Sequence, residues 1–425
     1  MLDNENSLEK WLAWLETAHP VEIDLGHTHI KQIADTLSLI NFDIPVIMVA
    51  GTNGKGSTVA TLEACYRAAG YMTGVYTSPH LLKFNERIRI NSLPVAEQSI
   101  VNAFTTIKKV LGKQTLSYFE YTTLAALEIF KYAQLDILIL EVGLGGRLDA
   151  VNIVEPDISV ITTIDYDHQA WLGETRELIA QEKAGILREN KPVVVMETDV
   201  PMALTHKIEA LSAQAYYYQK DYSAIQDGAS WTWLDNDVKI DNLPINNIPM
   251  SNLATAIKVM NLLQGKLPIA IQAISTGLHE IYIPGRCQTL NTQPLIIADV
   301  AHNAESAEQL SQFIKTQINK KKIHVIFSAL KDKDIKEIIA PMVLIAHDWH
   351  VAEIQHKRAA KIEVISSVIK EYSEKSCTIH SSLAKAYQEV LAKVENDDMI
   401  VVYGSFFTVS EILNEMQIKL YENLL

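Results

Sequence analysis

A glycine-rich segment that contains one lysine, residues 46–58, has the residue types of a phosphate-binding loop. The apolar run at 46–50 is followed by Gly51, Gly54, Lys55, Gly56, Ser57 and Thr58. Glycines let backbone N–H groups approach a phosphate, the lysine adds a positive charge, and the hydroxyl of a serine or threonine can ligate Mg²⁺. The lysine stands between two glycines, so the spacing departs from G-x-x-x-x-G-K-[ST], and we interpret the segment as a variant phosphate loop. An ordinary turn between a strand and a helix is the alternative.

Two further segments end apolar runs with residues that suit a metal ion. Glu141 follows the apolar residues 137–140, and a carboxylate at that point can hold Mg²⁺ beside bound phosphates. An ion pair between Glu141 and Arg147 is the alternative. The next apolar run leads to Asp165-Tyr166-Asp167-His168, where His168 is either a metal ligand or a solvated loop histidine.

Two more groups of polar residues are candidates for chemistry. Lys183 follows Glu182 inside a segment with a helical pattern, and taken alone this pair is interpreted as surface charge. Asp299 and His302 follow an apolar run in the C-terminal third, a position that suits ligand contact at the end of a strand. Capping of the next helix by Asn303 is the competing explanation for that segment.

Strand-like and helix-like segments alternate in the first half of the chain. The strand-like segments are 46–50, 73–77, 136–142, 158–163 and 193–196. The helix-like segments are 57–70, 97–111, 119–133, 174–188 and 202–213, together with both ends of 7–40. This alternation predicts an α/β fold with a mostly parallel sheet covered on both faces, and ligands bind such sheets beyond the carboxyl ends of the strands.

A second series of elements predicts a second, smaller domain. It begins after Ile283-Pro284-Gly285-Arg286, and its strand-like segments are 295–300, 323–328, 349–354 and 399–404. We place the domain boundary near 285, which separates residues 1–284 from residues 285–425. The region 216–245, with its alternating tryptophans and turn residues, predicts a small antiparallel excursion.

Composition restricts the class of protein. The chain has 425 residues and a net charge of −14, which argues against extensive nucleic-acid binding but not against a local basic pocket. Cys65, Cys287 and Cys377 lie far apart, as is typical of reduced thiols. No apolar run reaches the roughly 18 residues of a membrane-spanning helix, and the N-terminal segment lacks the apolar core of a signal peptide. We therefore expect a cytoplasmic protein without a membrane partner and, because no coiled-coil pattern is present, a monomer.

Eight ordered motifs resemble those of the folylpolyglutamate synthase family, within the Mur ligase superfamily, and in particular its bacterial bifunctional dihydrofolate synthase/folylpolyglutamate synthase form. The resemblance runs from about Trp11 to about Leu413. The motifs are AGTNGKGS at 50–57, TSPHL at 77–81, FNERI at 84–88, EVGLGGRLDA at 141–150, EKAGI at 182–186, PGR at 284–286, DVAHN at 299–303 and GSF at 404–406.

The resemblance implies a fold and a reaction. The fold would be a Mur-ligase-like phosphate-loop domain that binds ATP and pterin, followed by a smaller Rossmann-like glutamate ligase domain. The reaction would be ATP-dependent addition of L-glutamate to dihydropteroate and to the γ-carboxylate of tetrahydrofolates. An acyl phosphate would be the intermediate, and the enzyme would act mainly by positioning and by neutralising charge.

The resemblance also implies roles for individual residues. ATP would be bound by Asn53, Gly54, Lys55, Gly56, Ser57, Asn252, Arg286 and Asp299, to which we add His302 from its place after the same apolar run. Two Mg²⁺ ions would be held by Ser78, Glu141 and His168, together with Ser57 of the loop. Lys183 matches a lysine that is carbamylated in this family, so Lys55, His168 and Lys183 are the expected catalytic residues.

The resemblance assigns the pterin substrate to three segments. These are Asp24, Leu25 and Gly26; Tyr118, Phe119 and Glu120; and Leu148, Asp149 and Ala150. Stacking of Phe119 on the pterin ring is one interpretation, and a core phenylalanine is the other.

The sequence leaves two rival functions open. A Mur-type ligase acting on a cell-wall precursor would share the phosphate loop, but such enzymes carry a separate domain ahead of it, and only 50 residues precede Gly51 here. A phosphate-loop NTPase without ligase activity is the second rival, and nucleotide hydrolysis that ignores folate and glutamate would identify it.

Overall fold

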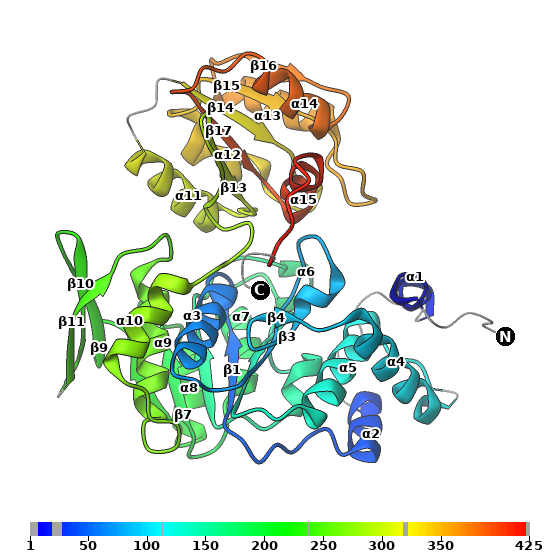
Figure 1. The fold of residues 1–425 in the computed structure, drawn as a ribbon, viewed down its shortest axis with the longest axis vertical. Coiled ribbons are helices and arrows are strands. Elements are labelled where there is room, and N and C mark those ends of the chain that lie inside the picture. Colours follow the sequence, from blue (N-terminus) through cyan, green and yellow to red (C-terminus); the bar gives the residue numbers. More distant parts are fainter. Residues whose placement is uncertain (1–6, 19–27, 113, 237, 318–321, 422–425) are drawn as a thin grey trace. The chain divides into compact units, whose positions relative to one another are not determined.

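The computed structural model describes residues 7–18, 28–112, 114–236, 238–317 and 322–421. The chain divides into two compact units, the first ending at Tyr282 and the second beginning at Ile283 (Figure 1). Each unit has one large sheet with its own helices, and the first unit also contains a small second sheet. Among the helices of these described ranges, none combines the length and the apolar character needed to cross a bilayer.

The first unit contains an eight-stranded sheet that is parallel except at one edge. The strand order is β4-β3-β2-β5-β1-β6-β7-β8. The parallel strands are β1 (Val46–Ala50), β2 (Thr73–Tyr76), β5 (Ile137–Glu141), β6 (Ile158–Ile161), β7 (Pro192–Val195) and β8 (Gln214–Tyr217), and the antiparallel edge is formed by β3 (Ile88–Ile90) and β4 (Leu93–Pro94). The predicted mostly parallel sheet is confirmed.

Helices cover both faces of this sheet, because successive residues of a strand point in opposite directions. Met48 and Ala50 of β1 belong to one hydrophobic core, and Ile47 and Val49 belong to another. The first core includes residues of α1 (Leu8–Ala18), α2 (Thr28–Leu37), α4 (Glu97–Leu111), α5 (Tyr118–Tyr132), α7 (Arg176–Lys183) and α8 (Met202–Ala210). The second includes residues of α3 (Lys55–Ala68), α9 (Met250–Leu262) and α10 (Ile271–Glu280), and α3 packs against both α9 and α10 (Figure 1).

A small antiparallel sheet lies in the same unit, in the order β11-β10-β9. Its strands are β9 (Tyr222–Asp227), β10 (Ser230–Asp235) and β11 (Val238–Pro244). Trp231 and Trp233 alternate along β10 and are both fully buried, and the Trp233 indole donates to the carbonyl oxygen of Ala254 on α9. The excursion expected over 216–245 is therefore present, but its first two residues are corrected: 216 and 217 belong to β8 of the large parallel sheet, because they pair with β7.

The second unit contains a six-stranded sheet in the order β12-β13-β17-β14-β15-β16, with β12 (Gln288–Thr292) antiparallel at one edge. The parallel strands are β13 (Leu295–Asp299), β14 (Ile323–Phe327), β15 (Asp348–Val351), β16 (Cys377–Ile379) and β17 (Met399–Tyr403). The helices are α11 (Ala304–Thr316), α12 (Ile335–Val343), α13 (Ile362–Tyr372), α14 (Leu383–Leu391) and α15 (Phe406–Glu415). The α/β class expected for this part of the chain is confirmed.

Candidate functional site

The glycine-rich segment forms a tight loop between the end of β1 and the start of α3. Gly54 has a φ of 84°, in the left-handed region that favours glycine, and a Cβ atom there would lie 2.4 Å from the amide nitrogen of Asn252. At Gly51 a Cβ atom would lie 1.7 Å from the hydroxyl oxygen of Thr162. Side chains at either position would collide with the neighbours that define the loop.

Two threonines that the sequence analysis missed support this loop from the end of β6. The Thr162 hydroxyl donates to the carbonyl oxygen of Asn53 over 2.7 Å. The backbone N–H of Thr52 donates to the Thr163 carbonyl oxygen over 2.7 Å, and the Asn53 N–H donates to the Thr163 hydroxyl over 3.0 Å. Both threonines directly follow β6, the strand beside β1. Their position at the end of this apolar run is the feature of the sequence that could have indicated a place beside the loop.

Lys55 and Lys183 place two amines near one another beside the loop. The Lys55 ammonium donates to the carbonyl oxygens of Gly51 at 2.9 Å and Thr52 at 3.2 Å. Burial, reinforced by the positive charge of Lys55, lowers the pKa of Lys183 to about 7. The surface-charge interpretation is wrong for Lys183, which is 3% exposed.

Glu141, the last residue of β5, is buried at the carboxyl edge of the sheet. One of its oxygens accepts the backbone N–H of Ser78 at 3.2 Å, and a Cβ atom at Gly56 would lie 4.0 Å from the other oxygen. Because β5 lies between β2 and β1, the sheet brings these three segments together. The alternative pairing with Arg147 is wrong, since Arg147 forms its ion pair with Glu182 at 2.8 Å.

His168 follows β6 on the other side of β1, so its segment leaves the same edge of the sheet. The residue has a φ of 52°, and its Nε2 atom lies 3.8 Å from the Asp167 carboxylate. Its side chain is 40% exposed, which suits a solvated loop as well as a ligand position. Metal ligation by His168 stays a prediction.

In the segment Tyr118–Glu120, the first two residues carry aromatic rings, and Glu120 completes a capping box with the N-cap residue Ser117 at the start of α5. The Glu120 carboxylate accepts the N–H and the hydroxyl of Ser117, both at 2.8 Å. Phe119 is half-buried and stacks on Tyr76 with ring centroids 6.0 Å apart. A Cβ atom at Gly143 would lie 2.5 Å from the Phe119 ring, so the glycine lets this ring approach the backbone after β5.

The segment Leu148–Ala150 begins with a half-buried leucine and turns at a buried carboxylate. Asp149 accepts the N–H groups of Leu144 at 2.8 Å and Val151 at 2.9 Å, and Ala150 begins a 3₁₀ turn. Burial raises the pKa of Asp149 to about 6, against the lowering effect of these N–H donors and of Lys55. The first predicted substrate segment, Asp24, Leu25 and Gly26, lies outside the described residues.

In the second unit, Asp299 ends β13 and is buried. It accepts the N–H groups of Cys287 and Ala301, both at 2.7 Å, and burial raises its pKa while the nearby Arg286 lowers it. Nδ1 of His302 lies 2.8 Å from the Val300 carbonyl oxygen. The competing explanation also holds, because the Asn303 side chain caps α11 by accepting the N–H of Ser306.

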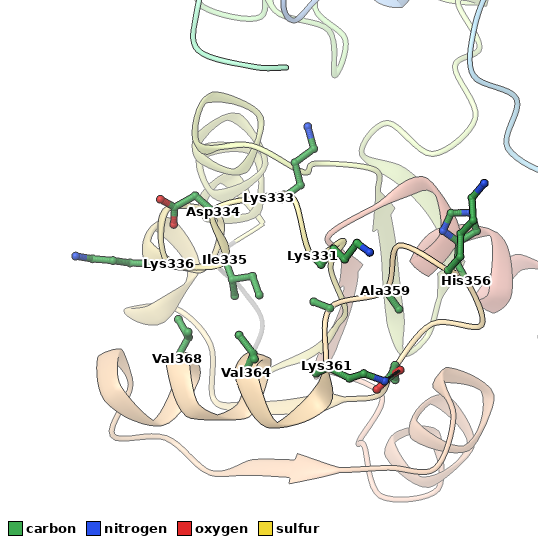
Figure 2. A pocket seen from close by; sticks show the side chains of 13 residues that line it. Lys331, Lys333, Asp334, Ile335, Lys336, His356, Ala359, Lys361, Val364 and Val368 are labelled. Atoms are coloured by element: carbon green, nitrogen blue, oxygen red, sulfur yellow. Dashed lines mark hydrogen bonds and ion pairs between the residues drawn. The ribbon is translucent and has the colours of Figure 1, made fainter. Parts of the chain in front are cut away.

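A lysine-rich pocket of about 620 Å³ lies elsewhere in the second unit (Figure 2). Val364 and Val368 of α13 face Ile335 across it, and basic side chains stand around its rim (Figure 2). These are Lys331, Lys333, Lys336, His356, Lys357 and Lys361. None of the residues expected from the sequence lines it, so the pocket is separate from the predicted nucleotide site.

Two family descriptions match the chain. The Mur ligase middle domain matches residues 49–263, and the Mur ligase glutamate ligase domain matches residues 285–406. The dihydrofolate synthase/folylpolyglutamate synthase of Escherichia coli strain K12 is 37% identical over 406 residues, covering 96% of this chain and 94% of that protein. The protein of the same name from Haemophilus influenzae is 38% identical, covering 95% and 96%.

Solved structures are similar over almost the same length. An Escherichia coli FolC structure in complex with DHPP and ADP has a TM-score of 0.92 and 36% identity, covering 97% of this chain and 98% of that chain. A bifunctional folylpolyglutamate synthase/dihydrofolate synthase with Mn, AMPPNP and L-glutamate bound has a TM-score of 0.90 and 38% identity, with the same coverage.

Proposed function

The chain belongs to the dihydrofolate synthase/folylpolyglutamate synthase family of Mur ligases, and from this we propose that it adds L-glutamate to dihydropteroate and to the γ-carboxylate of tetrahydrofolates. Both reactions use ATP and form an amide, as befits an ATP-dependent ligase. The observation that carries the proposal is the carboxyl edge of the first sheet, where the glycine loop follows β1 and the buried Glu141 ends the neighbouring strand β5, while the buried Lys183 of α7 lies close enough to Lys55 for the charge of Lys55 to lower its pKa.

We assign ATP phosphates to the loop formed by Asn53, Gly54, Lys55, Gly56 and Ser57. The start of α3 supplies N–H groups that no earlier turn of the helix satisfies. The Lys55 ammonium donates to loop carbonyls, which are neutral acceptors, and a phosphate oxygen is a stronger, charged acceptor for the same donor. Asn252 supports this geometry by holding Gly54, and this contact fits its proposed place beside ATP.

The chemistry of the donors fits Mg²⁺. Ser57, Ser78 and Glu141 offer oxygen atoms, the ligands that Mg²⁺ prefers, and Glu141 is a buried carboxylate beside the loop. We propose that these residues and His168 hold two ions. Bound Mg²⁺ would neutralise negative charge on the phosphates. A similar protein was solved with Mn and AMPPNP bound, which supports the proposal that this chain binds a divalent metal and a nucleotide.

We further propose that Lys183 is carbamylated. With a pKa of about 7, a large fraction of this amine is neutral near neutral pH, and the neutral amine is the form that attacks carbon dioxide. A nitrogen–carbon bond forms, the amine loses one proton to solvent, and the product is a carbamate anion. This change replaces a cation beside Lys55 with an anion, which removes the repulsion between the two groups.

The ligation then proceeds in two balanced steps. A carboxylate oxygen of the pterin substrate attacks the terminal phosphorus of ATP, the bond to the bridging oxygen breaks, and ADP leaves. The amine of L-glutamate attacks the acyl carbon, phosphate leaves with the bonding electrons, and the amine releases a proton. Tyr118 and Phe119 offer aromatic surface for the pterin, Asp149 positions the turn at Leu148–Ala150, and we assign Arg286, Asp299 and His302 to ATP.

Incubation of the purified protein with ATP, Mg²⁺ and labelled L-glutamate tests the proposal. One reaction contains dihydropteroate and a second contains tetrahydrofolate, and we expect labelled amide product in both. Lys55→Ala should abolish product, while Lys83→Ala, which changes an exposed lysine, serves as the matched control. Absence of product in both reactions would refute the proposal.

The same assay separates the rival functions. ATP hydrolysis that is indifferent to folate and glutamate would favour an NTPase, and ligation of an amino acid to a UDP-linked precursor would favour a cell-wall enzyme. The expected monomeric state and cytoplasmic location stay predictions, and light scattering of the purified chain tests the first.

A further inference from the structure

Two histidines and an aspartate form a compact cluster in the second unit, away from the residues discussed above. His324 lies on β14, and Asp348 and His350 lie on the neighbouring strand β15. One ligand atom from each residue lies within 4.8 Å of the other two. The Nδ1 atom of His324 is 2.9 Å from the Asp348 carboxylate, and the Nε2 atom of His350 is 3.3 Å from the same oxygen.

The 3.3 Å separation between His350 and Asp348 matches the requirement of a tetrahedral metal ion, and the 2.9 Å contact between His324 and Asp348 is a few tenths of an ångström shorter. Zinc–nitrogen and zinc–oxygen bonds of about 2.0–2.1 Å place two ligand atoms roughly 3.3 Å apart. Two imidazole nitrogens and one carboxylate oxygen are a set that suits zinc, whereas Mg²⁺ prefers oxygen ligands alone. The Asp348 side chain is 20% exposed, so the cluster is not sealed from solvent.

The atoms behind the two histidines are arranged as the outer layer of a metal site. The other ring nitrogen of His350 lies 2.9 Å from Nε2 of His380, and Nδ1 of His380 lies 3.4 Å from the Glu389 carboxylate on α14. The other ring nitrogen of His324 faces the Asp398 carboxylate at 3.7 Å. His350 thus has a hydrogen-bonded partner on its outer side, of the kind that fixes the tautomer and orientation of a metal-ligating imidazole, whereas the Asp398 carboxylate stands opposite the outer nitrogen of His324 beyond hydrogen-bond distance.

The cluster places polar side chains on one face of the sheet, where they lie beneath a helix. Val325, Phe327, Trp349 and Val351 alternate with these residues and belong to the apolar core on the opposite face. On the cluster's own face, α14 packs against β14 and β15. In the part of the chain that the structure describes, Nε2 of His324 and Oδ1 of Asp398 are buried without a hydrogen-bond partner. Burial of polar atoms in this state costs free energy, so the outer side of the cluster is not a fully satisfied hydrogen-bond network.

We propose that His324, Asp348 and His350 bind one zinc ion, with His380 orienting the imidazole of His350. His324 and Asp348 stand near the amino ends of their strands, whereas the predicted nucleotide residue Asp299 stands at the carboxyl end of β13. The ion would therefore link β14 to β15 and increase the stability of the second unit. This inference is independent of the proposed ligase function.

Titration with Co²⁺, which gives visible absorption bands in tetrahedral sites, tests the proposal on the full chain in excess Mg²⁺. We expect one ion per chain, displacement of Co²⁺ by Zn²⁺, and at least tenfold weaker binding in His324→Ala, His350→Ala and Asp348→Asn. His206→Ala, an exposed histidine in the first unit, is the matched control. Glu141→Ala should retain the ion, which separates this site from the predicted Mg²⁺ site.

X-ray absorption of the zinc-loaded wild-type chain provides evidence that does not depend on the folding of any variant. We expect a first shell of nitrogen and oxygen atoms with two imidazoles. Binding that is undetectable, or that is unchanged in both histidine variants, would overturn the proposal. A spectrum with one imidazole or none would overturn it equally.

Discussion

Asn252, on α9, donates its side-chain amide to the carbonyl oxygen of Gly54 over 3.0 Å, although 198 positions separate the two residues. The same nitrogen lies 3.1 Å from the hydroxyl of Thr58 on α3. Asn252 is 2% exposed, so its amide bonds to the glycine loop and to the first turn of the following helix and not to solvent. The end of α9 that carries Asn252 therefore helps to fix the conformation of the loop.

Replacement of Asn252 by alanine should weaken nucleotide binding. The change removes two hydrogen bonds, each contributing about 1 kcal/mol, and leaves the Gly54 carbonyl without this donor. We expect KM for ATP to rise about tenfold or more, with a smaller change in KM for glutamate. Asn261→Ala, at the other end of α9, is the control for altered helix packing. An unchanged KM for ATP would show that the loop keeps its shape without Asn252.

Replacement of Gly54 by alanine should damage the same loop by two separable effects. A Cβ atom would strain a backbone with φ of 84° and would lie 2.4 Å from the Asn252 nitrogen. Left-handed backbone costs a residue with a Cβ atom about 1 kcal/mol, so most of the loss should come from the collision. In the background Asn252→Ala, Gly54→Ala should therefore be less harmful than in the wild-type chain. Equal losses of ATP affinity in the two backgrounds would contradict this explanation.

Removal of Lys183 should abolish ligation, and an added short-chain carboxylate should restore part of it. The carboxylate would occupy the space of the proposed carbamate and supply its negative charge. We also expect ¹³C-bicarbonate to give a carbamate NMR signal in the wild-type chain that is lost in Lys183→Ala. Lys207→Ala, on the exposed side of α8, should behave as wild type. Wild-type rates in Lys183→Ala without added carboxylate would eliminate the carbamate from the mechanism.

Asp149 should make stability depend on pH. Its pKa is about 6 in the folded chain and about 3.8 when unfolded, so between these values the folded chain holds the extra proton. Stability therefore falls as pH rises from about 3.8 to 6, by on the order of 3 kcal/mol. The asparagine of Asp149→Asn does not titrate. The free energy of unfolding of the wild-type chain, measured in urea and taken relative to that of this variant, should therefore fall by that amount between pH 3.8 and pH 6. Asp227→Asn, an exposed aspartate, is the control, and a difference that stays constant with pH would be inconsistent with the shift.

The ion pair between Arg89 and Glu63 should contribute strongly to the first unit. The two charged groups approach to 2.8 Å, and their side chains are only 10% and 6% exposed. Arg89→Ala leaves a buried, unpaired carboxylate and should cost on the order of 3–5 kcal/mol of unfolding free energy. Arg358→Ala, which breaks an exposed pair with Asp332, should cost about 1 kcal/mol or less. The double variant Glu63→Leu, Arg89→Met should recover much of the unfolding free energy that Arg89→Ala loses. If it does not, the unpaired carboxylate is not the cause of that loss.

Arg89 also links this pair to the segment that carries Ser78. Its guanidinium donates to the Thr77 hydroxyl and to the Glu86 carbonyl oxygen, both at 3.1 Å. This function was not apparent in the sequence, because an arginine in a short strand has no local feature that marks it as buried. Burial depends on the elements packed around a residue, and these come from distant parts of the chain.

Local patterns were sufficient for the α/β class, the glycine loop and most of the parallel strands. An apolar run followed by glycines specifies its turn within a few residues, since glycine alone tolerates the backbone conformation and the close neighbours at Gly51 and Gly54. The bounds of an apolar strand are also marked locally, so the expected strands agree with the observed ones to within a few residues.

Only the tertiary structure decided which strands are neighbours and which charges are buried. Pairing of β5 between β2 and β1 brings Glu141 to Ser78 and Gly56, and packing around α7 buries Lys183 although its sequence resembles a surface pair. Thr162, Thr163 and Asn252 acquire their function in the same way. Hydrogen bonds between distant strands and desolvation by surrounding elements are properties of the whole fold, and no window of sequence contains them.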